Sequence, residues 1–234
     1  EVIRALARLD PDVDVVVRTS PPAAFVARAA RVPLRVERAE VDVGVVQVDS
    51  LQPDEAATAA EAARFYAGFA ARVAEEAIVL DRLGATLVVG DAPPLAFAAA
   101  ALRRVPSVAV ANFTWDWIYE GFPSFAERAP GVLETMRDAY ASTTLALRLP
   151  FHGDFATMPS IRDIPLVARR SGRRREATRQ ALGLDSNRPV VLASFGGHRT
   201  PVALERFLDE AAFTVLATSF EVEAPPGQIG RAHV

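Results

Sequence analysis

Apolar and polar residues follow one another along the chain in blocks that predict strands and helices in turn. Short runs rich in β-branched residues occur at 13–19, 85–90 and 106–111, and helix-like stretches occur at 23–30 and 94–103. Strands that are apolar on both faces and separated by helices are typical of a parallel sheet covered on both sides. The pattern therefore predicts an α/β fold with a doubly wound parallel sheet, because right-handed crossovers place helices on both faces.

The longest predicted helix runs from about Pro53 to Leu83. Its apolar stripe is Phe65, Phe69, Val73 and Leu80. Gly84 follows at the position where a glycine commonly ends a helix. Before this helix, residues 33–49 contain apolar residues at alternate positions, such as Val41, Val43 and Val45, and this spacing predicts one or two strands.

A change of organisation follows a predicted helix near 131–141 and a strand at 143–149. Residues 150–164 show no periodic pattern, and a helix at 173–182 and a strand at 189–195 come after them. We interpret residues 1–160 as one nearly complete Rossmann-like domain and residues 161–228 as a linker and the start of a second Rossmann-like domain. The second domain continues with a helix from about Pro201 and an apolar run at 213–220.

Both ends of the chain are expected to be truncated. The first residue is Glu1 rather than Met, and the opening residues have a helical pattern without a capping residue before them. Residues 229–234 (IGRAHV) fit no periodic pattern and are similar to the translation of a common sequencing adapter. An ordinary frayed tail is the alternative. We leave these residues out of the fold prediction.

Composition narrows the class of protein. Half of the residues are hydrophobic, which predicts a sizeable core. The 26 basic and 29 acidic residues give a net charge of −3, which argues against nucleic acid as the partner. The chain has no cysteine, so disulfides and thiolate metal sites are excluded. No apolar run reaches the roughly 18 residues of a membrane span and no signal peptide opens the chain, so we expect a cytoplasmic protein.

Polar residues gather where two predicted parallel strands end. Asp91 follows one strand, and Asn112, Thr114, Trp115 and Asp116 follow the next. Ligands of open parallel sheets bind at the carboxyl ends of the strands, so these residues would share one rim if the two strands are neighbours. Asp91 has an equally weighted alternative as the N-cap of the following helix.

The two tryptophans of the chain, Trp115 and Trp117, both belong to this stretch. Packing against the following helix is the alternative to a role in a site. Two residues spaced i, i+2 do not share one helical face, so we expect one indole to pack inward and the other to face the cleft.

A second candidate site is the turn formed by Phe195, Gly196, Gly197 and His198. An apolar strand that runs into two glycines and a helix start can present backbone N–H groups to a phosphate. The standard nucleotide-binding fingerprints are absent here, and a plain tight turn explains the glycines equally well on local evidence.

Three other features carry less weight. The Asp12–Asp14 pair precedes its strand and therefore lies at the wrong edge for a metal site. The five arginines within 169–175 fit a solvated linker, although contact with a membrane surface stays open. The isolated histidines His152 and His233 have no zinc-like spacing, so no metal site is predicted.

The residues VVGDAPP and NFTWDW, within 88–120, resemble the N-terminal domain of GT-B glycosyltransferases, and especially the glycosyltransferase-like N-terminal portion of L-arabinokinases. IPLVARR and RPVVLASFGG, at 164–170 and 188–197, resemble the crossing into the nucleotide-binding domain of that family. The likeness covers most of residues 1–220. The first strand with its glycine-rich loop, most of the C-terminal domain and a kinase domain are absent from the sequence.

The resemblance implies transfer of a sugar from a nucleotide-sugar donor to a small-molecule or glycan acceptor, without a metal or other cofactor, because helix dipoles and backbone amides bear the diphosphate charge. A carboxylate would take the proton of the acceptor, and Asp91 and Asp116 are the candidates. Asn112, Thr114 and Trp115 would bind the substrate, and the 195–198 turn would bind the nucleotide. The alternative is a non-catalytic sugar- or nucleotide-binding module of an arabinokinase-like multidomain protein. The 234-residue chain alone is expected to be inactive.

Overall fold

The structure, a computed structural model, describes residues 1–185, 187–194 and 213–217. The chain divides into two compact units. The first consists of Glu1–Val45 and Glu55–Arg169, and the second consists of Val46–Asp54 and the chain from Arg170 onward. All of the predicted rim residues, from Asp91 to Asp116, belong to the first unit, so this unit carries the candidate site.

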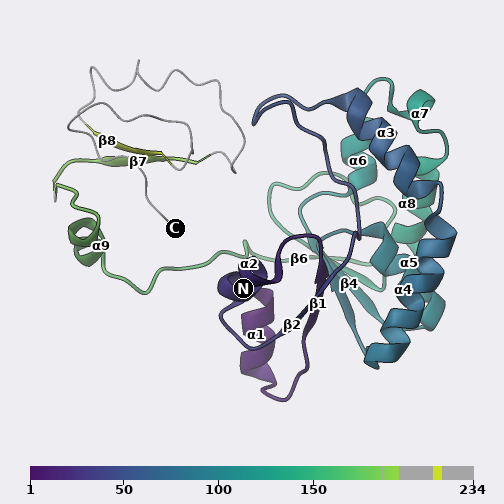
Figure 1. Cartoon of the computed structure of the whole chain (residues 1–234), viewed down its shortest axis with the longest axis horizontal. Coiled ribbons are helices and arrows are strands. Elements are labelled where there is room, and N and C mark those ends of the chain that lie inside the picture. Colours follow the sequence, from purple (N-terminus) through teal and green to yellow (C-terminus); the bar gives the residue numbers. More distant parts are fainter. Residues whose placement is uncertain (186, 195–212, 218–234) are drawn as a thin grey trace. The chain divides into compact units, whose positions relative to one another are not determined.

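One or more helices separate most of the successive strands of the first unit, as the apolar pattern predicts (Figure 1). In chain order the elements are α1 (Val2–Leu9), β1 (Val16–Thr19), α2 (Ala23–Ala30), β2 (Arg35–Arg38), α3 (Glu55–Tyr66), α4 (Phe69–Leu83), β3 (Val88–Gly90), α5 (Pro94–Arg103), β4 (Ser107–Ala111), α6 (Trp115–Glu120), α7 (Phe125–Arg128), α8 (Val132–Ala141), β5 (Leu145–Arg148) and β6 (Ile161–Asp163). The helix predicted at 94–103 is confirmed with the same bounds.

All strand pairs of the first unit are parallel. β1 pairs with β2, and a separate sheet has the order β3-β4-β5-β6. Among the described residues, no strand pairing joins these two sheets. The predicted α/β class with parallel strands is confirmed, while the single doubly wound sheet stays a prediction. Burial differs from the prediction at β3, because Val89 keeps 42% of its surface exposed.

Helix α5 is central to the packing of this unit. It packs between α4 and α8 and contacts β3 and β4 (Figure 1). Fully buried alanines on the strands, Ala109 and Ala146, leave room for large side chains such as Phe97 of α5 and Tyr140 of α8. Because these aromatic residues are buried directly behind the ends of β3 and β4, they also support the turns that follow those strands.

Two predicted elements differ from the structure. The helix predicted from Pro53 to Leu83 is two helices, α3 and α4, because the backbone of Gly68 leaves the helical conformation at φ −109° and ψ 20°. The end of this helix is confirmed: Gly84 caps α4 with a positive φ of 60°. The valines at 41, 43 and 45 do not form a strand. Their segment is a loop in which Gly44 has a φ of 73°, a conformation that interrupts an extended chain.

One strand was missed by the sequence analysis. β6 lies in the stretch 150–164 that shows no periodicity, and its three residues are all exposed. It pairs with β5, and the carboxylate of Asp163 binds the guanidinium of Arg148 at 2.7 Å. A short exposed edge strand has no apolar face, so no apolar alternation marks it in the sequence.

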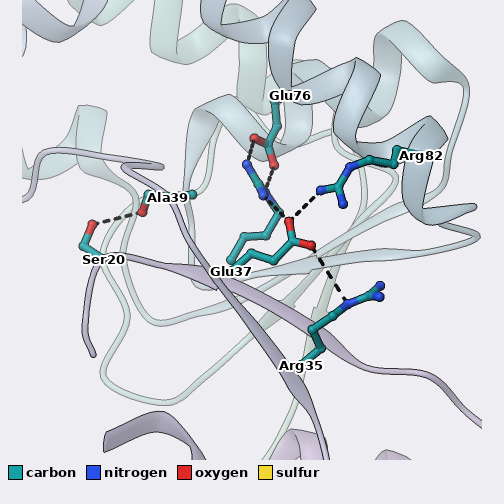
Figure 2. Close-up of polar contacts among 7 residues, drawn as sticks. Ser20, Arg35, Glu37, Ala39, Glu76 and Arg82 are labelled. Carbon is teal, nitrogen blue, oxygen red and sulfur yellow. Dashed lines mark hydrogen bonds and ion pairs between the residues drawn. The ribbon is translucent and has the colours of Figure 1, made fainter. Parts of the chain in front are cut away.

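An ion-pair network attaches the β1–β2 sheet to helix α4 (Figure 2). The guanidinium of Arg18 donates to both carboxylate oxygens of Glu76, at 2.6 and 2.7 Å, and to Glu37 at 2.8 Å. Arg82 donates to the same oxygen of Glu37 at 2.7 Å. The Arg18 and Glu76 side chains are only 19% and 11% exposed, so this bidentate pair is largely shielded from solvent and stabilises the contact between sheet and helix.

The second unit contains helix α9 (Arg175–Ala181) and a parallel pair of strands, β7 (Val190–Ala193) and β8 (Thr214–Ala217). The predicted helix at 173–182 and strands at 189–195 and 213–220 are thereby confirmed within the described residues. The stretch 46–54 adds a bridge between Gln47 and Pro53. The predicted helix from about Pro201 and residues 229–234 lie outside the described residues.

Candidate functional site

The two strands that lead to the predicted site are hydrogen-bonded neighbours. β3 pairs in parallel with β4, with Gly90 opposite Ala109. Asp91 directly follows β3, and Asn112 directly follows β4. The condition for a shared rim is therefore fulfilled: both residues leave the same edge of one parallel sheet, which is the edge where ligands of such sheets bind.

The carboxylate of Asp91 is not a helix cap. The residue at the N-cap of α5 is Pro93, and no side chain caps this helix. Within the described chain the Asp91 carboxylate makes no hydrogen bond or ion pair, and its residue is exposed. Partial desolvation by the surrounding atoms nevertheless raises the pKa of Asp91 above its ordinary value. The capping alternative is thus wrong, and the rim presents a free carboxylate that binds protons more tightly than an ordinary aspartate does.

The two tryptophans lie in different surroundings. Trp115 is partly buried against the core cluster. Trp117 is 44% exposed, and its indole covers Gly153, where a Cβ atom would lie 2.5 Å from the ring. Only a glycine allows this close approach. The prediction that one indole packs inward is confirmed, and the inward one is Trp115.

Asp42, which no pattern in the sequence singles out, contacts Trp115 directly. The indole Nε1 of Trp115 donates to Oδ2 of Asp42 at 3.2 Å. Desolvation raises the pKa of Asp42; the hydrogen bond from Trp115 opposes this shift, and the charge of Asp91 adds to it. The loop of Asp42 is also held by Tyr119, whose hydroxyl donates to the carbonyl of Gly44 at 2.6 Å.

Asp116 and Thr114 lie deeper than the rim. Asp116 is in the first turn of α6, its side chain is 9% exposed, and its Oδ2 accepts from Nε of Arg137 at 3.3 Å. Its Oδ1 is buried without a hydrogen-bond partner in the described chain. Thr114 is 1% exposed and its hydroxyl donates to the carbonyl of Asp154 at 3.1 Å. Both side chains already have contacts within the fold that hold the α6 turn in place.

A single buried hydroxyl connects the two strand-end turns. Tyr140 accepts from the backbone N–H of Trp115 at 3.1 Å and donates to the carbonyl of Ala92 at 2.9 Å. Ala92 follows Asp91 and has a φ of 54°, in the left-handed region that non-glycine residues seldom adopt. The Tyr140 hydroxyl therefore fixes the turn that carries Asp91 relative to the turn that carries Trp115.

Other chemistry-bearing features lie away from this rim. A pocket of mixed charge contains none of the predicted site residues, and it is lined by Arg18, Arg38, Ala39, Glu40, Arg72, Glu75, Glu76, Val79 and Leu95. In the part of the chain that the structure describes, no group of three His, Cys, Asp or Glu side chains could hold a metal ion, and no helix has the length and apolarity to cross a membrane. The candidate nucleotide residues Phe195, Gly196, Gly197 and His198 lie outside the described residues.

The fold and the rim define an α/β protein with parallel sheets and with carboxylates at the ends of neighbouring strands. The chain is 30% identical over 199 residues to an L-arabinokinase of Arabidopsis thaliana, and this similarity covers 84% of the chain. It covers 19% of the relative, so the chain spans about a fifth of the length of the curated protein it matches. No family model matches the chain. The similarity shows that this chain and L-arabinokinase are related.

Proposed function

We propose that the chain is the acceptor-side part of a glycosyltransferase, which in the intact protein transfers a sugar from a nucleotide-sugar donor to an acceptor hydroxyl. The observation that supports this proposal best is the free carboxylate of Asp91 at the strand-end rim. A general base needs a pKa near the working pH and must be free to accept a proton. Desolvation shifts the pKa of Asp91 upward, in the direction that a general base needs, and its lack of partners within the described chain leaves it free to accept a proton.

The other predicted residues take different parts in this proposal. Asn112 lies beside Asp91 on the rim and would bind acceptor hydroxyls, and Trp115 would offer part of its ring to the acceptor. Asp116 is paired with Arg137, and the Thr114 hydroxyl is used within the fold. We therefore assign Asp116 and Thr114 to positioning the α6 turn. The turn at 195–198 would bind the donor phosphates through backbone N–H groups, without a metal.

The test is sugar transfer by the intact protein that contains this chain, with Asp91→Asn compared with Asp138→Asn. Asp138 is an exposed carboxylate of α8 in the same unit. Loss of a general base should lower turnover roughly a hundredfold or more, while the control should keep wild-type turnover. Equal turnover of the two variants would overturn the role of Asp91.

A second candidate function takes its starting point from the name of the relative. The relative is named as a kinase, and a module that only binds a sugar or nucleotide would fit inside such a multidomain protein. The two functions differ in one measurement: only the glycosyltransferase would release the nucleoside diphosphate from a nucleotide-sugar in an acceptor-dependent way.

A further inference from the structure

A small pocket of about 260 Å³ lies beside the carboxyl ends of β1 and β2. Helix α4 lines it with Arg72, Glu75, Glu76 and Val79, which have the i, i+3, i+4, i+7 spacing of one helical face. The ends of the two strands and the first turn of α5 supply the remaining walls. None of the residues assigned to sugar transfer lines this pocket, so it is a second candidate site of the first unit.

Most charged side chains of this pocket already have partners. Arg18 donates to both carboxylate oxygens of Glu76, and this bidentate pair fixes one wall (Figure 2). Nη1 of Arg72 lies 3.4 Å from Oε2 of Glu40. The guanidinium carbon of Arg72 also lies 4.3 Å from the centre of the Phe65 ring, a cation–π distance. These contacts hold both arginines and both glutamates in place within the fold.

Two charged side chains of opposite sign are left over. Arg38, at the end of β2, and Glu75, in α4, both line the pocket and are exposed. Neither makes a hydrogen bond or an ion pair within the described chain, with each other or with another residue. Beside them, Val79 and the buried Leu95 provide an apolar part of the wall. The pocket therefore offers one free guanidinium, one free carboxylate and an apolar surface.

The charges of this pocket favour one class of ligand. Its lining contains three arginines and three glutamates, so their formal charges cancel. An anion would satisfy Arg38 but would place a like charge near Glu75, and a cation would do the reverse. A molecule with one carboxylate and one ammonium group satisfies both through charge-assisted hydrogen bonds. The volume of about 260 Å³ lies below the roughly 300–1,000 Å³ of pockets for drug-sized ligands, so the ligand is small.

We propose that this pocket binds a small zwitterion, such as a free amino acid with an apolar side chain. Arg38 donates to the carboxylate of the ligand, Glu75 accepts from its ammonium group, and Val79 and Leu95 contact its apolar part. The site is independent of the proposed function, because neither sugar transfer nor the relationship to L-arabinokinase assigns a ligand to these residues.

Three ligands with a common apolar part test this proposal. L-leucine carries both charged groups, 4-methylpentanoate lacks the ammonium group, and 3-methylbutylamine lacks the carboxylate. Each is titrated at pH 7 against the 234-residue chain, and binding is followed by saturation-transfer difference NMR. We expect L-leucine to bind at least tenfold more tightly than either analogue, because each analogue leaves one charged group of the pocket without a partner.

Two variants decide which residues are responsible. Arg38→Gln should weaken the binding of L-leucine about tenfold and leave that of 3-methylbutylamine unchanged. Glu75→Gln should weaken the binding of L-leucine by a similar factor and should not weaken that of 4-methylpentanoate. Both side chains are exposed and have no partner in the described chain, so both variants should fold normally, which circular dichroism checks. The matched controls Arg8→Gln and Glu134→Gln remove exposed charges elsewhere in the first unit and should bind L-leucine as the parent does.

Several outcomes would overturn the proposal. If 4-methylpentanoate bound as tightly as L-leucine, the pocket would be a simple anion site, and if 3-methylbutylamine did so, it would be a simple cation site. Absence of L-leucine binding would overturn the proposal directly. Equal weakening by the pocket variants and the two controls would show that only the overall charge of the surface matters. None of these results concerns Asp91, so the proposed function is tested separately.

Discussion

Tyr140→Phe should loosen the turn that carries Asp91. The substitution removes the hydroxyl that accepts from the N–H of Trp115 and donates to the carbonyl of Ala92. Tyr140 is 0% exposed and Ala92 is 1% exposed, so water cannot replace the lost partner without entering the core. Each unsatisfied buried group costs roughly 1–3 kcal/mol. With partial relaxation, we expect the free energy of unfolding to fall by about 2–4 kcal/mol.

The assay is urea unfolding followed by tryptophan fluorescence and circular dichroism, since both tryptophans of the chain lie next to the affected turn. Tyr66→Phe is the matched control because it removes the same atom from another buried tyrosine. The Tyr66 hydroxyl has no partner in the described chain, so its removal should change the free energy of unfolding by less than about 0.5 kcal/mol or increase it.

The comparison of the two variants decides the result. Equal losses from Tyr140→Phe and Tyr66→Phe would show that the two hydrogen bonds of Tyr140 do not hold the turns together. A large loss from Tyr140→Phe with an unchanged urea dependence of the unfolding free energy would attribute the effect to the native state rather than to a change in the unfolded chain.

Three further predictions concern charged groups of the first unit. Arg18→Met should lower the free energy of unfolding by roughly 2–3 kcal/mol, because it leaves the shielded carboxylate of Glu76 without its partner. The double variant Arg18→Met with Glu76→Leu should recover most of the lost stability. A double variant as unstable as the single one would contradict this prediction. Desolvation and the charge of Asp91 raise the pKa of Asp42 in the folded protein. The protonated side chain therefore contributes to the free energy of unfolding below pH 3.8, the ordinary pKa of the group. This contribution is lost as the pH rises through the pKa of the folded state. Asp42→Asn should therefore gain stability relative to wild type between pH 4 and 7, and a flat difference in urea titrations would refute it. Asp91→Asn should keep or raise its melting temperature at pH 7, because desolvation disfavours the charged carboxylate, whereas a loss of about 1 kcal/mol would restore the capping role.

Local sequence patterns predict much of the first unit because its central elements have strong local signals. The helix α5 starts at Pro94, which suits a first helical turn, and ends in four alanines, Leu102 and Arg103, which all have high helical propensity. The strand β4 is short, apolar and bounded by Pro106 and Asn112. Such signals depend on neighbouring residues alone, so the sequence contains all the information needed to place these elements.

Other features depend on contacts between distant residues. The valines around Asp42 have the spacing of a strand, but they form a loop. Two hydrogen bonds hold this loop: the Tyr119 hydroxyl donates to the carbonyl of Gly44, and the indole of Trp115 donates to the carboxylate of Asp42. Trp115 and Asp42 are 73 residues apart in the chain, and no local pattern relates them. The same reasoning explains why the ion pair of Asp116 with Arg137 could not be predicted: it requires α6 to pack on α8, which becomes known only from the assembled core.

The residues after Asp91 explain why its carboxylate stays free. An aspartate at the end of a strand ordinarily bonds the first N–H groups of the next helix, but Pro93 and Pro94 have no N–H to donate. The turn needs another anchor, and the Tyr140 hydroxyl supplies it by binding the carbonyl of Ala92. Since this anchor uses the backbone, the turn is held while the side chain of Asp91 remains available for a ligand. An aspartate with only a structural role would use its carboxylate to hold the turn. Here the backbone holds the turn and the carboxylate of Asp91 has no structural task, which supports a role for Asp91 in binding or proton transfer.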